Sequence, residues 1–117
     1  MKNQAVDTLE DSVELFKAFA DPVRLRLLNL LSDGEVCVCR LHEALELPQS
    51  TVSRHLAYLR ERGIVKGRKE GLWVHYRLAK PRNELHRALI DRLENACGRE
   101  TSRRDKSKLD RGGSCKG

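Results

Sequence analysis

The chain has 117 residues and a mass of 13.4 kDa, which is the size of one domain. Hydrophobic residues make up 39% of it and aromatic residues only 4%, so we expect an aliphatic core rather than a disordered chain. The formal net charge is +6, and the apolar runs are too short for a transmembrane helix or a secretion signal, which excludes a membrane protein and predicts a soluble, cytoplasmic one.

Two amphipathic helices are predicted at the start of the chain. Apolar residues recur at steps of three and four between residues 8 and 19, which predicts the first helix. Asp21 and Pro22 predict the start of the second, because an aspartate accepts bonds from free amides and proline fits the first helical position. This helix is expected to end at Gly34, which can adopt the left-handed conformation found after many helices.

A helix-turn-helix followed by a hairpin is predicted next. A short helix lies within residues 36–46, Leu47 and Pro48 interrupt it, and a second helix covers residues 49–62. Residues 64–78 then change to a period of two around a polar turn, which indicates a β-hairpin. The fold class is therefore expected to be mainly α with a β-hairpin wing, the winged helix-turn-helix arrangement.

The last helix and the end of the chain differ in composition. After Pro81, leucines at steps of four predict a fifth helix that carries Leu93. From residue 99 onward, Ser, Gly, Arg and Lys dominate, so we expect a domain of residues 1–98 and a basic, disordered tail of residues 99–117. The apolar rows of the first and last helices exceed what so small a core needs, which predicts a homodimer that packs through them.

Positive charge is concentrated in the predicted second helix of the helix-turn-helix and in the wing. Residues 49–80 carry eight Lys and Arg against two Asp and Glu, whereas residues 1–48 carry five against nine. Taken one at a time, these side chains could simply cap a helix or decorate a turn, but together with the charge step they favour double-stranded DNA as the partner. The candidate DNA contacts are Gln49, Ser50, Thr51, Ser53, Arg54 and His55 on the helix and Arg68 and Lys69 at the hairpin tip.

Four motifs resemble the arsenical-resistance repressors of the ArsR/SmtB family: ADPVRL, GEVCVC, VSRHL and WVHYRL, at residues 20–25, 34–39, 52–56 and 73–78. The resemblance extends over roughly residues 10–97. It implies a homodimeric winged-helix repressor that binds an inverted-repeat operator without metal and is released by metal. It also implies DNA contacts at Gln49, Ser50, Ser53, Arg54 and His55. Family members often have serine where this chain has Pro48, so the usual helix cap is missing.

The resemblance also identifies Cys37 and Cys39 as metal ligands. The chain has four cysteines and no secretion signal, so we expect reduced thiols. Two thiolates can chelate a soft ion, and As(III) or Sb(III) is the expected inducer; the alternative is that both thiols only fill the core. In a regular helix residues i and i+2 point about 200° apart, so we expect ion binding to unwind that turn. The third ligand stays open among His42, Cys97 and Cys115, and two thiolates completed by water or an exogenous thiol are a further alternative.

The expected function is a metalloid-responsive transcriptional repressor without catalytic activity, catalytic cofactor or membrane partner. One alternative is an ArsR-type repressor that responds to Cd, Pb or Zn or to thiol oxidation. An alternative of another class is a small thiol redox enzyme. The chain has no Cys-x-x-Cys motif, no βαβ pattern and no glycine-rich phosphate loop, which makes the enzyme the weaker interpretation.

Overall fold

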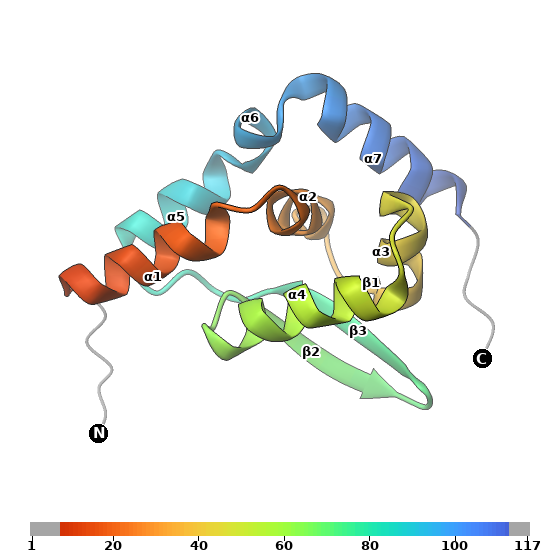
Figure 1. Cartoon of the computed structure of the whole chain (residues 1–117), viewed down its shortest axis with the longest axis horizontal. Helices are drawn as coiled ribbons and strands as arrows, with labels where there is room; N and C mark the ends of the chain where they lie inside the picture. The colour runs from red at the N-terminus through yellow and green to blue at the C-terminus, as the bar shows by residue number, and fades with distance from the viewer. Residues whose placement is uncertain (1–7, 113–117) are drawn as a thin grey trace.

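A computed structural model describes residues 8–112 of the chain. In that part, helices surround the central helix α2, and a small sheet lies along one side (Figure 1). The elements are, in chain order, α1 (Leu9–Phe19), α2 (Pro22–Leu31), β1 (Val36–Cys37), α3 (Val38–Leu45), α4 (Gln49–Glu61), β2 (Val65–Glu70), β3 (Trp73–Leu78), α5 (Glu84–Asp91), α6 (Leu93–Cys97) and α7 (Arg99–Arg111). None of these helices is long and apolar enough to cross a membrane.

The first two helices begin where the sequence predicts. Before α1, the Thr8 hydroxyl accepts a hydrogen bond from the Asp11 amide, and the Asp11 carboxylate accepts one from the Thr8 amide. α2 begins with Pro22 after Asp21, whose carboxylate accepts a bond from the Arg24 amide at 3.0 Å. The C-terminal half of α2 is buried, so this helix provides the core against which the other helices pack.

The predicted helix-turn-helix is confirmed as α3 and α4. Leu41 of α3 and Val52, Leu56 and Leu59 of α4 are all fully buried, so the two helices share one core. The turn between them contains Glu46, which adopts the left-handed conformation with φ 58° and closes α3 through its amide. Packing of the buried rows therefore fixes which face of α4 points outward.

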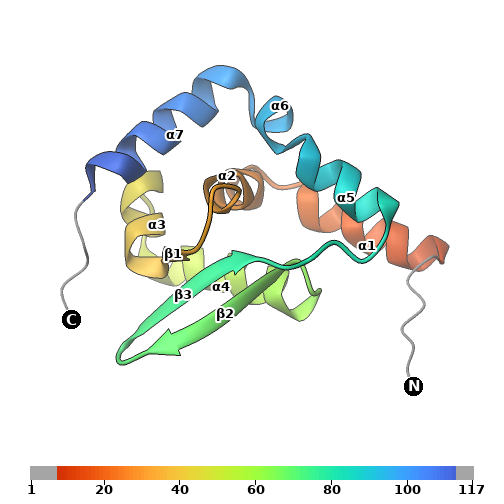
Figure 2. The ribbon, with the colours of Figure 1, turned by 180° about the vertical axis from the view of Figure 1, so that it is seen from behind.

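The sheet has three antiparallel strands in the order β1-β3-β2. β2 and β3 form the predicted hairpin, with Val65 opposite Leu78 and Glu70 opposite Trp73. This wing extends past the helices, as the views from both sides show (Figures 1 and 2). The sequence does not predict β1, and it extends the following helix back to residue 36, because a strand of two residues is too short to show a period of two.

The predicted fifth helix and tail need correction. The helix divides at Arg92 into α5 and α6, and residues 99–111 form the helix α7 instead of a disordered tail. α7 packs against α2 and α3, so the domain continues past residue 98 (Figure 1). The reason is that α7 buries polar residues, Ser102 and Asp105, whose partners lie far away in the sequence. Residues 113–117 lie outside the described residues.

Candidate DNA interface and thiol pair

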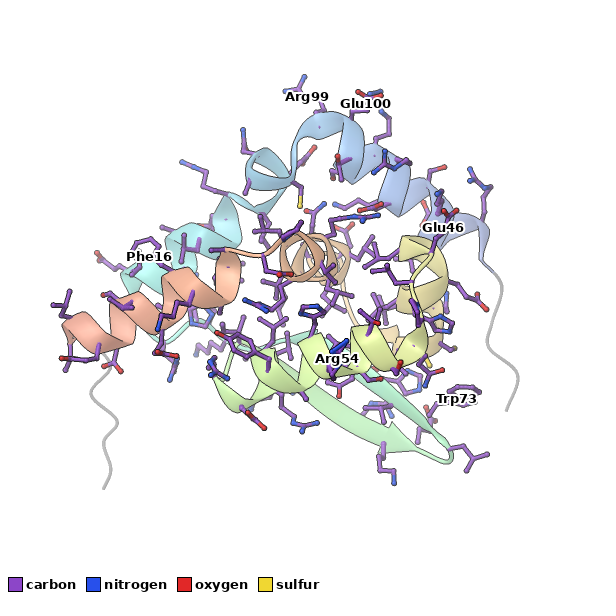
Figure 3. All side chains as sticks on the ribbon, in the orientation of Figure 1. Phe16, Glu46, Arg54, Trp73, Arg99 and Glu100 are labelled. Carbon is purple, nitrogen blue, oxygen red and sulfur yellow. The ribbon has the colours of Figure 1, made fainter. Side chains whose placement is uncertain are left out.

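The N-terminal part of α4 carries most of the predicted DNA contacts on its outward face. Gln49, Ser50 and Arg54 are exposed, and Thr51 and Ser53 are partly exposed, whereas Val52 beside them is fully buried. Arg54 comes from the middle of α4 (Figure 3), and its side chain is exposed. Short hydroxyl side chains, one amide and one guanidinium form a surface that fits a major groove and can bond to base edges. Pro48 precedes this helix and supplies no side-chain cap, as the sequence predicts.

His55 lies apart from this outward face, although the sequence places it among the DNA contacts. Its side chain is only 21% exposed, and its Nδ1 lies 3.3 Å from the Arg24 guanidinium and 3.9 Å from the Asp21 carboxylate. Burial lowers the pKa of His55, Asp21 raises it, and Arg24 and Arg54 lower it further. Residue 55 is adjacent to the buried Leu56, and one step of about 100° along the helix turns its ring toward α2. The structure therefore makes His55 part of an internal network.

That network, which sequence reasoning missed, connects α1 with α4. The Arg24 guanidinium donates to the carbonyls of Ala18 at 2.8 Å and Lys17 at 2.9 Å, which closes the C-terminal end of α1. It also lies over the Tyr58 ring, 4.2 Å from the ring centroid, and Arg62 lies over the same ring at 3.6 Å. Arg24 comes from α2, whereas Tyr58 and Arg62 come from α4 and the residue that follows it. The periodicity of one helix alone therefore does not predict this Arg–Tyr–Arg grouping.

A second contact joins α1 to the C-terminal end of α4 at the surface. The Arg62 guanidinium donates to the Glu14 carboxylate of α1 at 3.4 Å. It also donates to the Tyr58 carbonyl of α4 at 3.2 Å. α1 is thus attached to α4 at two places, through Arg24 and through Arg62.

The two basic residues predicted at the wing have different surroundings. Arg68 donates twice to the Glu35 carboxylate, at 2.7 and 3.1 Å, and this pairing raises the Arg68 pKa and lowers the Glu35 pKa. Lys69 is exposed on the neighbouring position. Leu72 at the tip is 85% exposed. Lys69 is therefore exposed on the wing, whereas Arg68 is held between the wing and the residue before β1.

The sulfur atoms of Cys37 and Cys39 are adjacent, but only Cys37 of the two is a free thiol, because Cys39 is disulfide-bonded. The Sγ atoms of Cys37 and Cys39 lie 3.2 Å apart, and both side chains are buried, with exposed fractions of 7% and 4%. Cys37 has the extended backbone of a strand, with φ −70° and ψ 143°, and precedes the first helical residue, Val38. The expectation that both thiols lie on one helix and point apart is therefore wrong. The two sulfur atoms are therefore adjacent while α3 is intact.

The proposed third ligands do not join this pair among the described residues. The His42 ring nitrogen Nδ1 lies 3.1 Å from the Leu47 carbonyl, and the Cys97 thiol donates to the Leu25 carbonyl at 3.3 Å. Burial raises the pKa of Cys97, and Asp105 raises it further. Residues 8–112 contain no group of three or more His, Cys, Asp or Glu side chains that could hold a metal ion. Cys115 lies outside that range.

An apolar face remains on α1. Leu9, Val13 and Phe16 are 75%, 41% and 52% exposed, and they recur at steps of four and three along one side of the helix. Figure 3 places Phe16 at the side of the molecule where α1 and α5 lie together. An apolar row of this kind on so small a protein is typical of an interface.

Together, the helix-turn-helix, the hairpin beside it and the polar face of α4 define a winged helix-turn-helix DNA-binding domain. More specifically, the chain belongs to the arsR family of bacterial regulatory proteins: residues 21–66 match the family described as "Bacterial regulatory protein, arsR family". It is accordingly a transcriptional regulator and not an enzyme.

Individual relatives of the chain are also named as transcriptional regulators. The chain is 44% identical over 89 residues to an uncharacterized HTH-type transcriptional regulator of Methanocaldococcus jannaschii, which covers 75% of this chain and 100% of that protein. It is 54% identical over 68 residues to the arsenical resistance operon repressor of Escherichia coli, covering 57% of this chain and 58% of the repressor.

Solved structures show the same fold. HlyU from Vibrio cholerae superimposes with a TM-score of 0.66 at 38% identity, over 77% of this chain and 96% of HlyU. The homodimeric winged helix-turn-helix DNA-binding domain of Mb0332 from Mycobacterium bovis, a possible ArsR-family regulator, superimposes with a TM-score of 0.62 at 32% identity. That match covers 82% of this chain and 89% of the Mycobacterium domain.

Proposed function

We propose that the protein is a homodimeric repressor that binds operator DNA and is released when As(III) or Sb(III) binds to Cys37 and Cys39. The observation that carries this proposal is the pair of buried sulfur atoms 3.2 Å apart at the start of α3, the helix directly before the recognition helix α4. Soft ions prefer sulfur ligands, and two sulfur atoms at this separation can bind one ion. The name of the Escherichia coli relative, an arsenical resistance operon repressor, supports the same inducer.

DNA binding is assigned to the outward face of α4 and to the wing. Gln49 and Arg54 pair with bases, and the hydroxyls of Ser50, Thr51 and Ser53 bond to bases or phosphates. Lys69 contacts the flanking phosphates from the wing. A dimer related by a two-fold axis carries two recognition helices, so its operator is an inverted repeat.

The dimer forms through the apolar faces of α1 and α5. The row of Leu9, Val13 and Phe16 supplies the exposed apolar surface, and α5 lies directly beside α1. The homodimeric Mycobacterium domain supports this assembly. Because Arg24 and Arg62 join α1 to α4, the dimer interface also fixes the position of the recognition helix.

Binding of arsenite to the reduced pair is an exchange of oxygen for sulfur. Two As–O bonds of As(OH)₃ break and two As–S bonds form, and each thiol proton leaves with a hydroxide as water, so As(III) keeps its oxidation state. The ion then restrains both Cys37 in β1 and Cys39 in α3. Operator and ion favour different arrangements of these elements, and the coupling between two such sites is typically about 1–3 kcal/mol, or about 5- to 150-fold in affinity.

The test is operator release measured by fluorescence anisotropy of a labelled duplex, with the protein reduced by a phosphine. Wild-type protein is titrated with arsenite, antimonite, Cd(II) and Zn(II), and release by arsenite or antimonite at the lowest concentrations is expected. Cys37→Ser and Cys39→Ser should keep operator affinity but lose this release, because a hydroxyl is a poor ligand for a soft ion. Cys97→Ser is the matched control and should behave as wild type.

Two results would contradict the proposal. Release of both serine variants at the wild-type arsenite concentration would mean that the thiol pair only fills the core. Release of the wild type by Cd(II) or Zn(II) alone would assign a different inducer.

For the DNA contact, Arg54→Ala should abolish specific binding while the fold is unchanged by circular dichroism, since Arg54 lies outside the core.

A further inference from the structure

The turn that joins α3 to the recognition helix α4 contains one strained residue. Among the described residues, Glu46 is the only one other than glycine with a positive φ, at 58°. A side chain with a Cβ is unfavourable in this left-handed conformation, which is why glycine commonly ends a helix in this way. The Glu46 amide donates to the Glu43 carbonyl at 3.1 Å, and the next amide donates to the His42 carbonyl at 3.1 Å. Glycine would make both backbone bonds equally well, so they do not explain a glutamate here.

The Glu46 side chain connects this turn to α7. The Lys108 ammonium donates to its carboxylate at 2.6 Å. This hydrogen bond, together with the Lys108 charge, lowers the pKa of Glu46. Figure 3 shows Glu46 at the end of α3 that lies beside α7. The turn is therefore attached to a helix outside the helix-turn-helix and outside residues 21–66, which match the family.

α7 is itself attached to the core, so it presents Lys108 at a fixed position. The Arg26 guanidinium of α2 donates to both carboxylate oxygens of Asp105 at 2.9 Å, and Asp105 is 1% exposed. Two charge-assisted bonds in parallel fix direction as well as distance. Further along α7, Arg40 of α3 donates to the Leu109 carbonyl at 2.7 Å. Lys108 lies between these two attachments, which restrict its backbone.

Resting on the operator binding proposed above, we propose that Lys108 positions the recognition helix α4 and does so through Glu46. Only residues 46–48 separate α3 from α4, so the backbone direction at Glu46 decides where α4 points. Side chains that bond to base edges must be held to within about 0.5 Å of the productive geometry. Phosphate contacts carry no sequence information, and non-specific binding rests on them. The Lys108–Glu46 pair should therefore matter for specific binding and much less for non-specific binding.

The same pair adds little to the stability of the fold. The Glu46 and Lys108 side chains are 68% and 29% exposed, and exposed ion pairs contribute little to the free energy of unfolding. Glycine at position 46 would adopt the same φ without strain. Replacement of Glu46 by glycine therefore removes the contact with α7 and relieves the backbone, so stability and specific binding should change in opposite directions.

The experiment compares full-chain wild type with Glu46→Gly, Lys108→Met and Lys106→Met. Lys106 is the matched control, because it is a lysine of the same helix whose ammonium pairs with Asp33 at 3.2 Å, outside the helix-turn-helix. Fluorescence anisotropy gives the affinity for a duplex that the wild type selects from a random pool and for a scrambled duplex of the same length. Circular dichroism gives the Tm of each variant at one protein concentration.

Glu46→Gly and Lys108→Met should each lower the ratio of specific to non-specific affinity about tenfold, which is the discrimination that one good base contact supplies. Lys106→Met should keep the wild-type ratio. The Tm of Lys108→Met should stay within about 2 °C of wild type, and that of Glu46→Gly should not fall. Two further variants test the pairing itself. Lys108→Arg should keep the ratio, and Glu46→Lys combined with Lys108→Glu should recover most of the ratio that Lys108→Glu alone loses.

The outcomes separate this proposal from the one on which it rests. A wild-type ratio in Glu46→Gly or Lys108→Met, no recovery in the double variant, or an equal loss in Lys106→Met would overturn the role of Lys108. Loss of specific and non-specific affinity in the same proportion would overturn it in favour of a direct phosphate contact. A lower Tm of Glu46→Gly together with its lower ratio would reduce the pair to a structural contact. Failure of the operator binding has a different signature, because Arg54→Ala would then keep the wild-type ratio.

Discussion

Replacing Asp105 with alanine tests whether α7 is an integral part of the domain. Asp105 is 1% exposed and accepts two hydrogen bonds from Arg26 at 2.9 Å. The hydrogen bond and charge of Asp105 raise the pKa of Arg26, although partial burial acts in the opposite direction. Truncation leaves the guanidinium with no carboxylate in a partly buried position and removes the main attachment of α7 to α2.

The expected cost follows from the burial of the two partners. Breaking a buried ion pair costs about 3–5 kcal/mol, because the remaining charge is left without its partner. The Arg26 side chain is 25% exposed and can recover some hydration, so we expect about 2–3 kcal/mol here. For a domain of about 100 residues, 1 kcal/mol corresponds to roughly 4 °C, which gives a fall in Tm of about 8–12 °C.

Urea and thermal unfolding followed by circular dichroism measure this effect, at one protein concentration because a dimer gains stability with concentration. Asp110→Ala is the matched control, since Asp110 is an exposed aspartate on the same helix and its loss should change stability by no more than about 0.5 kcal/mol. If Asp105→Ala had the same Tm and urea midpoint as Asp110→Ala, the ion pair would not be what anchors α7.

Three further predictions concern the dimer, the α1–α4 connection and pH. Phe16→Asp places a charge in the apolar row of α1 and should give a monomeric mass in light scattering at micromolar concentration; an unchanged dimer would move the interface elsewhere. Arg24→Ala removes the bonds that join α1 to His55 and should lower operator affinity although Arg24 itself is not assigned to DNA; equal affinity in anisotropy would refute this connection. Burial, and secondarily Arg82, lowers the pKa of His86 below 6.5, so the unfolded chain binds the proton more tightly and the free energy of unfolding should fall below pH 6.5, by at most about 1.4 kcal/mol per pH unit. His86→Gln should flatten this slope in urea titrations, and His55, whose pKa is also lowered, contributes to the slope that remains.

Much of the fold could be predicted from the sequence because its signals are local. The cap at Asp21 and the period of the apolar residues predict the helices, and the change to a period of two predicts the wing. The outward face of α4 follows in the same way from its buried row, which is why Arg54 is exposed as predicted.

The parts that could not be predicted depend on contacts between distant residues. α7 has almost no apolar residues, and its buried face depends on Arg26, which lies 79 positions from Asp105. The inward orientation of His55 depends on Arg24 in α2. The separation of the two sulfur atoms depends on the extended backbone of Cys37, which in turn depends on the pairing of β1 with β3. No short stretch of the sequence contains both partners of any of these contacts, so local patterns cannot predict them.

The register of β1 has a mechanical consequence for the domain. Cys37 lies opposite His75, and Val36 lies opposite Tyr76. The backbone that holds one of the two sulfur atoms is therefore also an edge strand of the sheet. On the other side, Cys37 is bonded directly to Val38, the first residue of α3. Side chains alternate between the two faces of a strand, so a shift of one position would turn the Cys37 sulfur to the opposite face. β1 can therefore either stay in register or separate from β3. A displacement of Cys37 is transmitted to the wing through the pairing with β3 and to the helix-turn-helix through Val38.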